Sequence, residues 1–75
     1  MTNTFELECA IKKKGFTKKQ VAEILGLSEY GLQLKLQNKN EFKASEIATL
    51  CNVLDLEDNS IFFVNESELN SHRAN

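Results

Sequence analysis

The sequence predicts an all-α domain of five short helices with a polar C-terminal tail. The 75 residues include no proline, which favours helices over a loop-rich fold. Apolar residues recur at the three- and four-residue spacing of amphipathic helices. Four of the predicted helices also begin with a pair of apolar residues five positions apart, which is the spacing of a hydrophobic staple. These pairs are Phe16 and Val21, Leu27 and Leu32, Phe42 and Ile47, and Leu56 and Ile61.

The bounds of the helices follow from these start signals and from glycines at helix ends. Thr17 and Gln20 have the spacing of a capping box, and Ser28 is a good N-cap for the next helix. Gly15 and Gly26 each follow a helix as a C-terminal glycine. The predicted helices span residues 5–14, 18–25, 29–37, 44–54 and 58–63.

The helical periodicity also predicts which side chains face the core. The inward-facing residues expected from it are Leu7, Ala10, Ile11, Val21, Ala22, Leu25, Leu32, Leu36, Ile47, Ala48, Leu50, Cys51 and Leu54. Two cysteines are too few for a disulfide framework, so we expect Cys9 and Cys51 to be reduced and buried in helices.

The length and composition limit the classes of function that the chain can have. Seventy-five residues form one domain at most, which we place at residues 1–64, with a polar, frayed tail over 65–75. No spacing typical of metal ligands, phosphate loops or catalytic residues is present, so we expect no metal, no cofactor and no enzyme activity. The acidic N-terminus and the absence of a long apolar run predict a cytoplasmic protein without a membrane segment.

The charge is distributed unevenly along the chain, although the net charge is only −2. Residues 12–43 hold eight lysines against three glutamates, whereas residues 44–75 hold six acids against one arginine. A local basic surface determines the attraction to a phosphate backbone more than the overall charge does. The central segment is therefore a candidate surface for nucleic acid, unless its lysines are only solvated surface residues.

The segment from Phe16 to Asn40, FTKKQVAEILGLSEYGLQLKLQNKN, resembles the helix-turn-helix of Cro and lambda-type repressors, the XRE family. It contains in order a small residue between two helices, a corner glycine, an apolar residue, a helix cap and an anchoring leucine. These are Ala22, Gly26, Leu27, Ser28 and Leu32. The resemblance covers about residues 5–64 and implies a small five-helix lambda-repressor-like domain with its motif at about 17–38.

The resemblance implies a sequence-specific regulator that binds double-stranded DNA, of the repressor type found in phages and mobile elements of bacteria. The helix over 29–37 would enter the major groove. Its base-reading residues would be Glu29, Tyr30, Gln33 and Leu34. Phosphate contacts would come from Lys18, Lys19, Asn38, Lys39, Asn40 and Lys43.

Two alternatives remain open at this point. Glu29 is acidic and Leu34 is apolar, which also suits a protein-binding module on the same fold, such as an antirepressor or an inhibitor of a host or phage protein. The second alternative concerns the apolar run Ile61, Phe62, Phe63 and Val64. These residues either close the core or form the surface of a homodimer, which would place two recognition helices about 34 Å apart.

Overall fold

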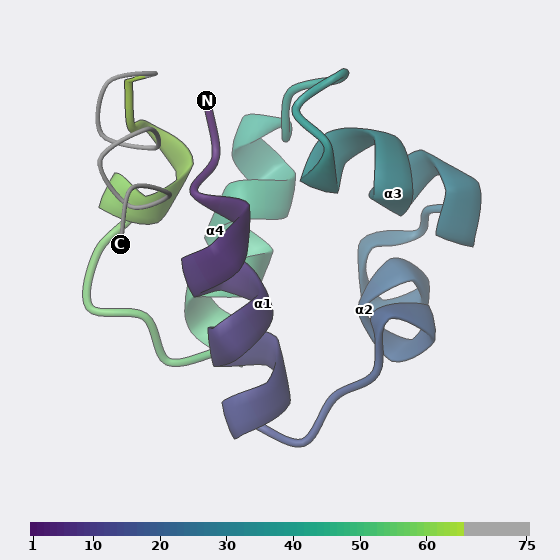
Figure 1. Cartoon of the computed structure of the whole chain (residues 1–75). Helices are drawn as coiled ribbons and strands as arrows, with labels where there is room; N and C mark the ends of the chain where they lie inside the picture. The colour runs from purple at the N-terminus through teal and green to yellow at the C-terminus, as the bar shows by residue number, and fades with distance from the viewer. Residues whose placement is uncertain (66–75) are drawn as a thin grey trace.

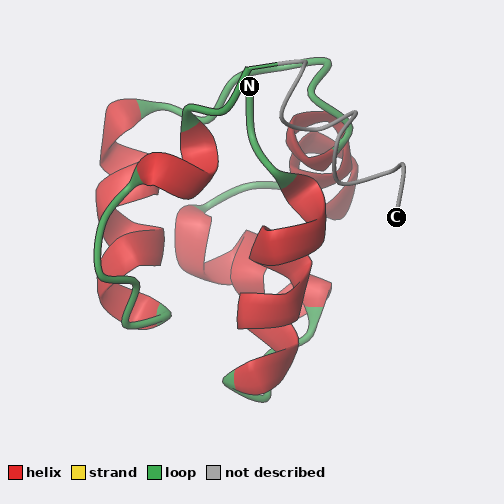
Figure 2. Cartoon of the chain, turned by 60° about the vertical axis from the view of Figure 1, so that its left-hand side comes forward, coloured by secondary structure: helices red, strands yellow, loops and turns green. Residues whose placement is uncertain are grey.

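The computed structural model describes residues 1–65, and all of its regular elements are helical (Figure 1). They are α1 (Thr4–Lys13), α2 (Lys18–Leu25), α3 (Glu29–Leu36), α4 (Ala44–Val53) and the 3-10 helix η1 (Ser60–Phe62). Figure 2 shows no strand within this part of the chain. The predicted all-α class is therefore confirmed. Apart from Asn65, the predicted tail lies outside the described residues.

The helices surround one core. In Figure 1, α1 and α4 occupy the middle of the view, the α2–α3 pair lies on one side and η1 on the other. Because they lie on opposite sides, the outer side of the α2–α3 pair and the region around η1 are separate surfaces of the molecule. None of the described helices is long and apolar enough to cross a membrane.

The start of each long helix depends on a local hydrogen bond. The Thr17 hydroxyl accepts from the Gln20 backbone N–H at 3.1 Å, and the Gln20 side chain accepts from the Thr17 backbone N–H at 2.9 Å. Ser28 accepts from Gly31 N–H at 2.9 Å. These two predicted caps are confirmed. Asn3 caps α1 by accepting from the backbone N–H of Glu6 at 3.2 Å, a cap that the sequence analysis missed.

The fifth predicted helix, over residues 58–63, is present only as a short 3-10 helix over Ser60–Phe62. The Asp58 carboxylate accepts from Ser60 N–H at 2.9 Å, which starts a tight turn instead of an α-helix. At Phe63 the backbone leaves the helical region, with φ −131° and ψ 44°. The next N–H, that of Val64, donates to the carbonyl of Met1 at 2.9 Å instead of extending a helix.

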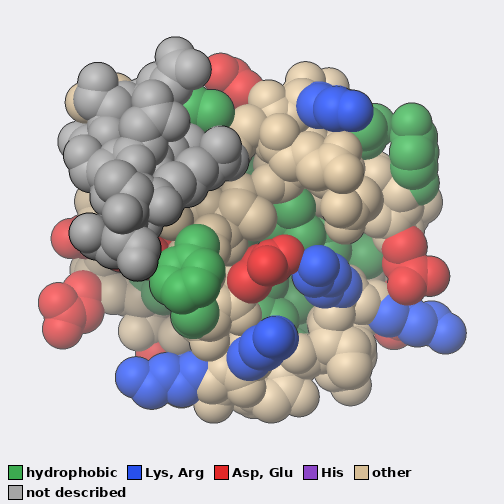
Figure 3. All heavy atoms as spheres, viewed as in Figure 1, with side chains coloured by type: hydrophobic (Ala, Val, Ile, Leu, Met, Phe, Trp, Pro, Cys, Tyr) green, Lys and Arg blue, Asp and Glu red, His purple; other side chains and the backbone are tan. Residues whose placement is uncertain are grey.

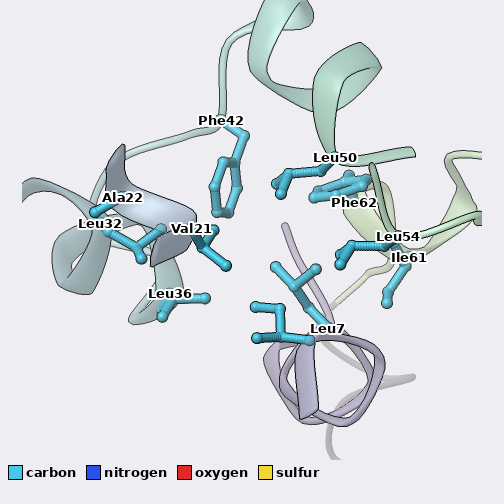
Figure 4. Close-up of a cluster of buried hydrophobic side chains, with 11 residues drawn as sticks. Leu7, Val21, Ala22, Leu32, Leu36, Phe42, Leu50, Leu54, Ile61 and Phe62 are labelled. Atoms are coloured by element: carbon cyan, nitrogen blue, oxygen red, sulfur yellow. The ribbon is translucent and has the colours of Figure 1, made fainter. Parts of the chain in front are cut away.

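The core collects apolar side chains from every element (Figure 4). Its buried residues are Leu7, Ile11, Val21, Ala22, Leu32, Leu36, Phe42, Leu50, Leu54, Ile61 and Phe62. The Phe42 and Phe62 rings pack edge to face, with centroids 5.5 Å apart. Most predicted inward positions are buried or packed against this cluster, but Cys9 and Ala48 are exposed. Cys9 lies two residues from both Leu7 and Ile11, so helical periodicity places it on the opposite side of α1 from these buried residues.

The N-terminal segment, residues 1–3, folds back and connects η1 with the end of α3. The Met1 ammonium donates to the Val64 carbonyl at 2.9 Å, and Asn3 N–H donates to the Ile61 carbonyl at 2.7 Å. On the other side, Thr2 N–H donates to the Asn38 side-chain oxygen at 2.8 Å, and the Asn38 amide donates back to the Thr2 carbonyl at 3.0 Å. Thr2 and Asn3 are buried as a result.

Candidate nucleic-acid interface

The α2–α3 pair is joined by a tight corner that determines which side of α3 faces outward. Gly26 has a left-handed backbone, with φ 70°, a conformation that glycine adopts without the steric cost of a β-carbon. The chain then enters α3 behind Ser28, and Leu32 and Leu36 point into the core. The opposite side of α3 is thereby left on the surface.

Three of the four predicted base-reading residues lie on this exposed side. Glu29, Tyr30 and Gln33 are exposed, and Tyr30 is exposed to 73%. Leu34 is only half-buried, because it lies at the border between the exposed and the inward side of α3. Gln37, which the sequence analysis did not select, is also exposed and follows Gln33 by four residues, so it extends the same side. That spacing alone could have identified it.

The predicted phosphate-contacting residues fall into two groups. Lys19, Lys39, Asn40 and Lys43 are exposed, and within the described residues none of these three lysines forms a salt bridge. Lys18 differs, because its ammonium group lies 2.9 Å from a carboxylate oxygen of Glu8 on α1. The other three lysines of this set thus lie in the first turn of α2 (Lys19) and in the segment that follows α3 (Lys39 and Lys43).

Asn38, a predicted phosphate contact, is engaged with the N-terminal segment of the chain. Its backbone is left-handed, with φ 60°, and its side-chain amide makes both hydrogen bonds to the backbone of Thr2. These two hydrogen bonds engage the amide oxygen and one of the two amide N–H groups, so a single N–H remains for any other contact. Asn38 therefore holds the N-terminal segment against the end of α3. The sequence contains no local signal for this contact, because the two residues are 36 positions apart.

The surface around these residues carries mixed charge. Figure 3 shows lysine side chains spread over this face of the molecule, with acidic side chains between them. Lys35, one of the eight lysines of residues 12–43, is buried and so adds no positive charge to this surface. No group of three or more possible metal ligands occurs in residues 1–65.

Lys35 forms a buried ion pair with Glu46, which joins α3 to α4. The two side chains are only 9% and 8% exposed, and the Lys35 ammonium also lies 5.9 Å from the centre of the Phe42 ring. The Glu46 carboxylate accepts from Lys35 and, at 2.8 Å, from the backbone N–H of Lys43. The pair was not predicted. The sequence does contain a signal for the burial of Lys35, since this residue follows the buried Leu32 by three positions and so falls on the inward side of α3.

Burial and hydrogen bonding act in opposite directions on the pKa of Glu46. Burial raises this pKa, but the hydrogen bonds from Lys35 and Lys43 and the positive charges of these lysines outweigh burial. The pKa of the Glu46 carboxyl consequently lies below its ordinary value of 4.5. Glu46 is therefore ionised at neutral pH, as the ion pair requires.

We expect the stabilisation by Glu46 to be lost in acid. Because folding lowers its pKa, Glu46 stabilises the folded state fully above its unfolded pKa, and this contribution disappears as the pH falls through the lower, folded value. Urea unfolding at a series of pH values should show the stability gap between the wild type and Glu46→Gln closing below about pH 4.5. A gap that is independent of pH would contradict this assignment.

The apolar run from Ile61 to Val64, predicted either to close the core or to form a dimer surface, is divided between core and surface. Ile61 and Phe62 are buried within the single chain, so their side chains are not available to a second copy. Phe63 is exposed to 65%, and Val64 is half-buried. η1 turns only once, which directs two consecutive residues inward and the third outward. Pairing of two copies stays a prediction that now depends on Phe63 and Val64.

Together, the fold and these surfaces define a small all-α domain with an exposed helix side. The chain belongs to the family described as "Protein of unknown function (DUF739)", whose model matches residues 3–66. This range contains all the described helices. No curated protein and no solved structure matches the chain.

Proposed function

We propose that this domain binds double-stranded DNA, with α2 and α3 as a helix-turn-helix and α3 as the recognition helix. One observation carries the proposal. Glu29, Tyr30 and Gln33 lie side by side on the exposed face of α3, whose other face is anchored in the core by Leu32 and Leu36. A rigidly held helix with polar side chains on its free face suits the dimensions of the major groove.

The exposed residues have chemistry that suits separate roles on DNA. Gln33 can pair with an adenine edge, and Glu29 can accept from the amino group of cytosine. Lys19, Lys39 and Lys43 are free to neutralise phosphates, which positions the domain without reading sequence. In this proposal the protein is a regulator of the Cro-like type, and its contacts resemble those implied by the motif, except that Asn38 has a structural role.

The proposal is tested by fluorescence anisotropy with duplex DNA over a range of salt concentrations. Log affinity should fall linearly with log salt, with a slope that reports the number of neutralised phosphates. Lys39→Ala should weaken binding to all sequences alike and reduce this slope by about one. Gln33→Ala should instead weaken binding to a sequence selected from a random library by about 1–3 kcal/mol, and so reduce the difference in affinity between that sequence and random duplexes.

A matched control separates specific phosphate contacts from the loss of any positive charge. Lys14 is ion-paired with Asp55, and Lys14→Ala should leave the salt slope unchanged. Identical behaviour of the Lys39 and Gln33 variants would show that the assigned roles are wrong.

A second candidate function is binding of another protein through the same face of α3. The exposed Tyr30 ring and the mixed charge around α3 support it, since aromatic side chains contribute strongly to protein interfaces. Absence of binding to any duplex at low salt would exclude the DNA proposal and favour this candidate. Tyr30→Ala should then abolish binding to the partner, whereas Lys39→Ala should not.

A further inference from the structure

A second surface of the molecule lies away from the exposed face of α3, between α4 and the chain around η1. It is a groove of about 470 Å³ whose apolar wall includes Ile47, Ala48, Cys51, Leu56 and Phe63. We call it the α4 groove. Figure 1 shows η1 and α3 on opposite sides of the molecule, so the η1 end of the α4 groove lies away from the exposed face of α3. Only Ala44, which follows the proposed phosphate contact Lys43, brings the groove lining near the proposed DNA-binding residues.

The α4 groove combines an apolar wall with an acidic edge. Phe63 is exposed to 65% although it is the largest apolar side chain of the wall. Glu57 and Asp58 line the groove as well, and no lysine or arginine does so among the described residues. Hydrogen bonds from Ser60 lower the pKa of the Asp58 carboxyl, so it stays charged at neutral pH. An occupant must therefore offer both apolar surface and positive charge.

We propose that the α4 groove is a docking site for a basic, amphipathic helical segment of a partner protein. Its apolar side chains pack on Phe63, Ile47 and Leu56, and its lysines or arginines face Glu57 and Asp58. Ala48 is small and exposed on α4, which lets a partner backbone approach closely. Insertion of an amphipathic helix into an apolar groove is a recurring mode of peptide recognition.

The charge of the groove disfavours a second copy of this chain as the occupant. A two-fold symmetric contact would bring the same patch of both copies together and so place four acids near one another. A contact between the groove and the lysines of another copy would not be symmetric, and it would propagate into open assemblies. The partner segment inferred from the groove is consequently a different protein.

The test uses two labelled synthetic helical peptides with the same leucine pattern, one with lysine and one with glutamate at the polar positions. Anisotropy should show binding of the leucine–lysine peptide and no binding of the leucine–glutamate peptide. Phe63→Ala should weaken binding roughly tenfold or more, because it removes the central apolar contact. Asp58→Asn, which retains the acceptor for Ser60 N–H, should weaken binding about twofold to threefold.

Matched variants distinguish the groove from general attraction of a basic peptide to an acidic protein. Glu23 is exposed on α2, and Glu23→Gln should leave peptide binding unchanged. Ala48→Gln fills the groove without adding charge and should weaken binding, with an unchanged helical circular-dichroism spectrum. Equal binding of both peptides, or no effect of Phe63→Ala, overturns the proposal. A dimer in sedimentation equilibrium that Phe63→Ala dissociates also overturns it, in favour of a second copy.

Discussion

Replacement of Glu46 by alanine is expected to lower the free energy of unfolding by about 3–5 kcal/mol, because it leaves the Lys35 ammonium buried without a counter-ion. The same change removes the acceptor for the Lys43 backbone N–H at the start of α4. A domain of this size has a small margin of stability, so such a loss is a large fraction of the total. Urea denaturation followed by circular dichroism measures the effect.

The double variant Lys35→Met with Glu46→Leu shows whether the charge imbalance is the cause. Replacing both members of a buried ion pair by apolar residues of similar volume is often neutral or stabilising. We therefore expect the double variant to be much more stable than Glu46→Ala. The exposed pair of Lys14 and Asp55 is the control, and Lys14→Ala should cost at most about 1 kcal/mol. A double variant as unstable as Glu46→Ala would show that the pair itself holds α3 and α4 together.

Leu32→Ala is expected to cost about 2–5 kcal/mol, the range for removing a fully buried leucine side chain. Leu32 is 1% exposed and anchors α3 against the core, so the truncation leaves a cavity under the helix that carries the proposed reading residues. Thermal and urea unfolding measure the loss of stability. Binding to DNA should weaken in proportion to the unfolded fraction and recover at lower temperature.

Ile24→Ala provides the comparison for this truncation. Ile24 is an aliphatic residue on α2 that is exposed to 41%, and its removal should change stability by no more than about 0.5 kcal/mol. Similar losses for Leu32→Ala and Ile24→Ala would mean that α3 is not anchored through Leu32.

The parts of the fold that were predicted from sequence depend on local signals. α2 begins and ends where Thr17 and Gly26 predict, because a cap and a left-handed glycine act within one turn of the helix. The last helix was predicted only in part, because its length and type depend on a contact with a residue far away in the sequence. The run from Ile61 to Val64 is as apolar as a helix core, but its backbone is redirected by Asp58 and by pairing with Met1, which is 63 residues away.

The candidate site could be predicted only in part for similar reasons. The exposure of Glu29, Tyr30 and Gln33 follows from helical periodicity once Leu32 is assigned to the core. The orientations of Asn38 and Lys35 depend instead on contacts with residues outside α3. Asn38 turned inward because the N-terminal segment reaches it, and Lys35 is buried because Glu46 lies opposite, although lysine is ordinarily a surface residue.

The hydrogen bonds between Met1 and Val64 make the described chain almost a closed ring. The two ends of this ring are linked at 2.9 Å in both directions, by the Met1 ammonium and by the Val64 N–H. In a variant that ends at Asn65, a short linker to Met1 would close the ring at little additional entropic cost, since the two points are already joined in the folded state. The domain is thus a natural candidate for backbone cyclisation or circular permutation, with new ends in an exposed connection between helices.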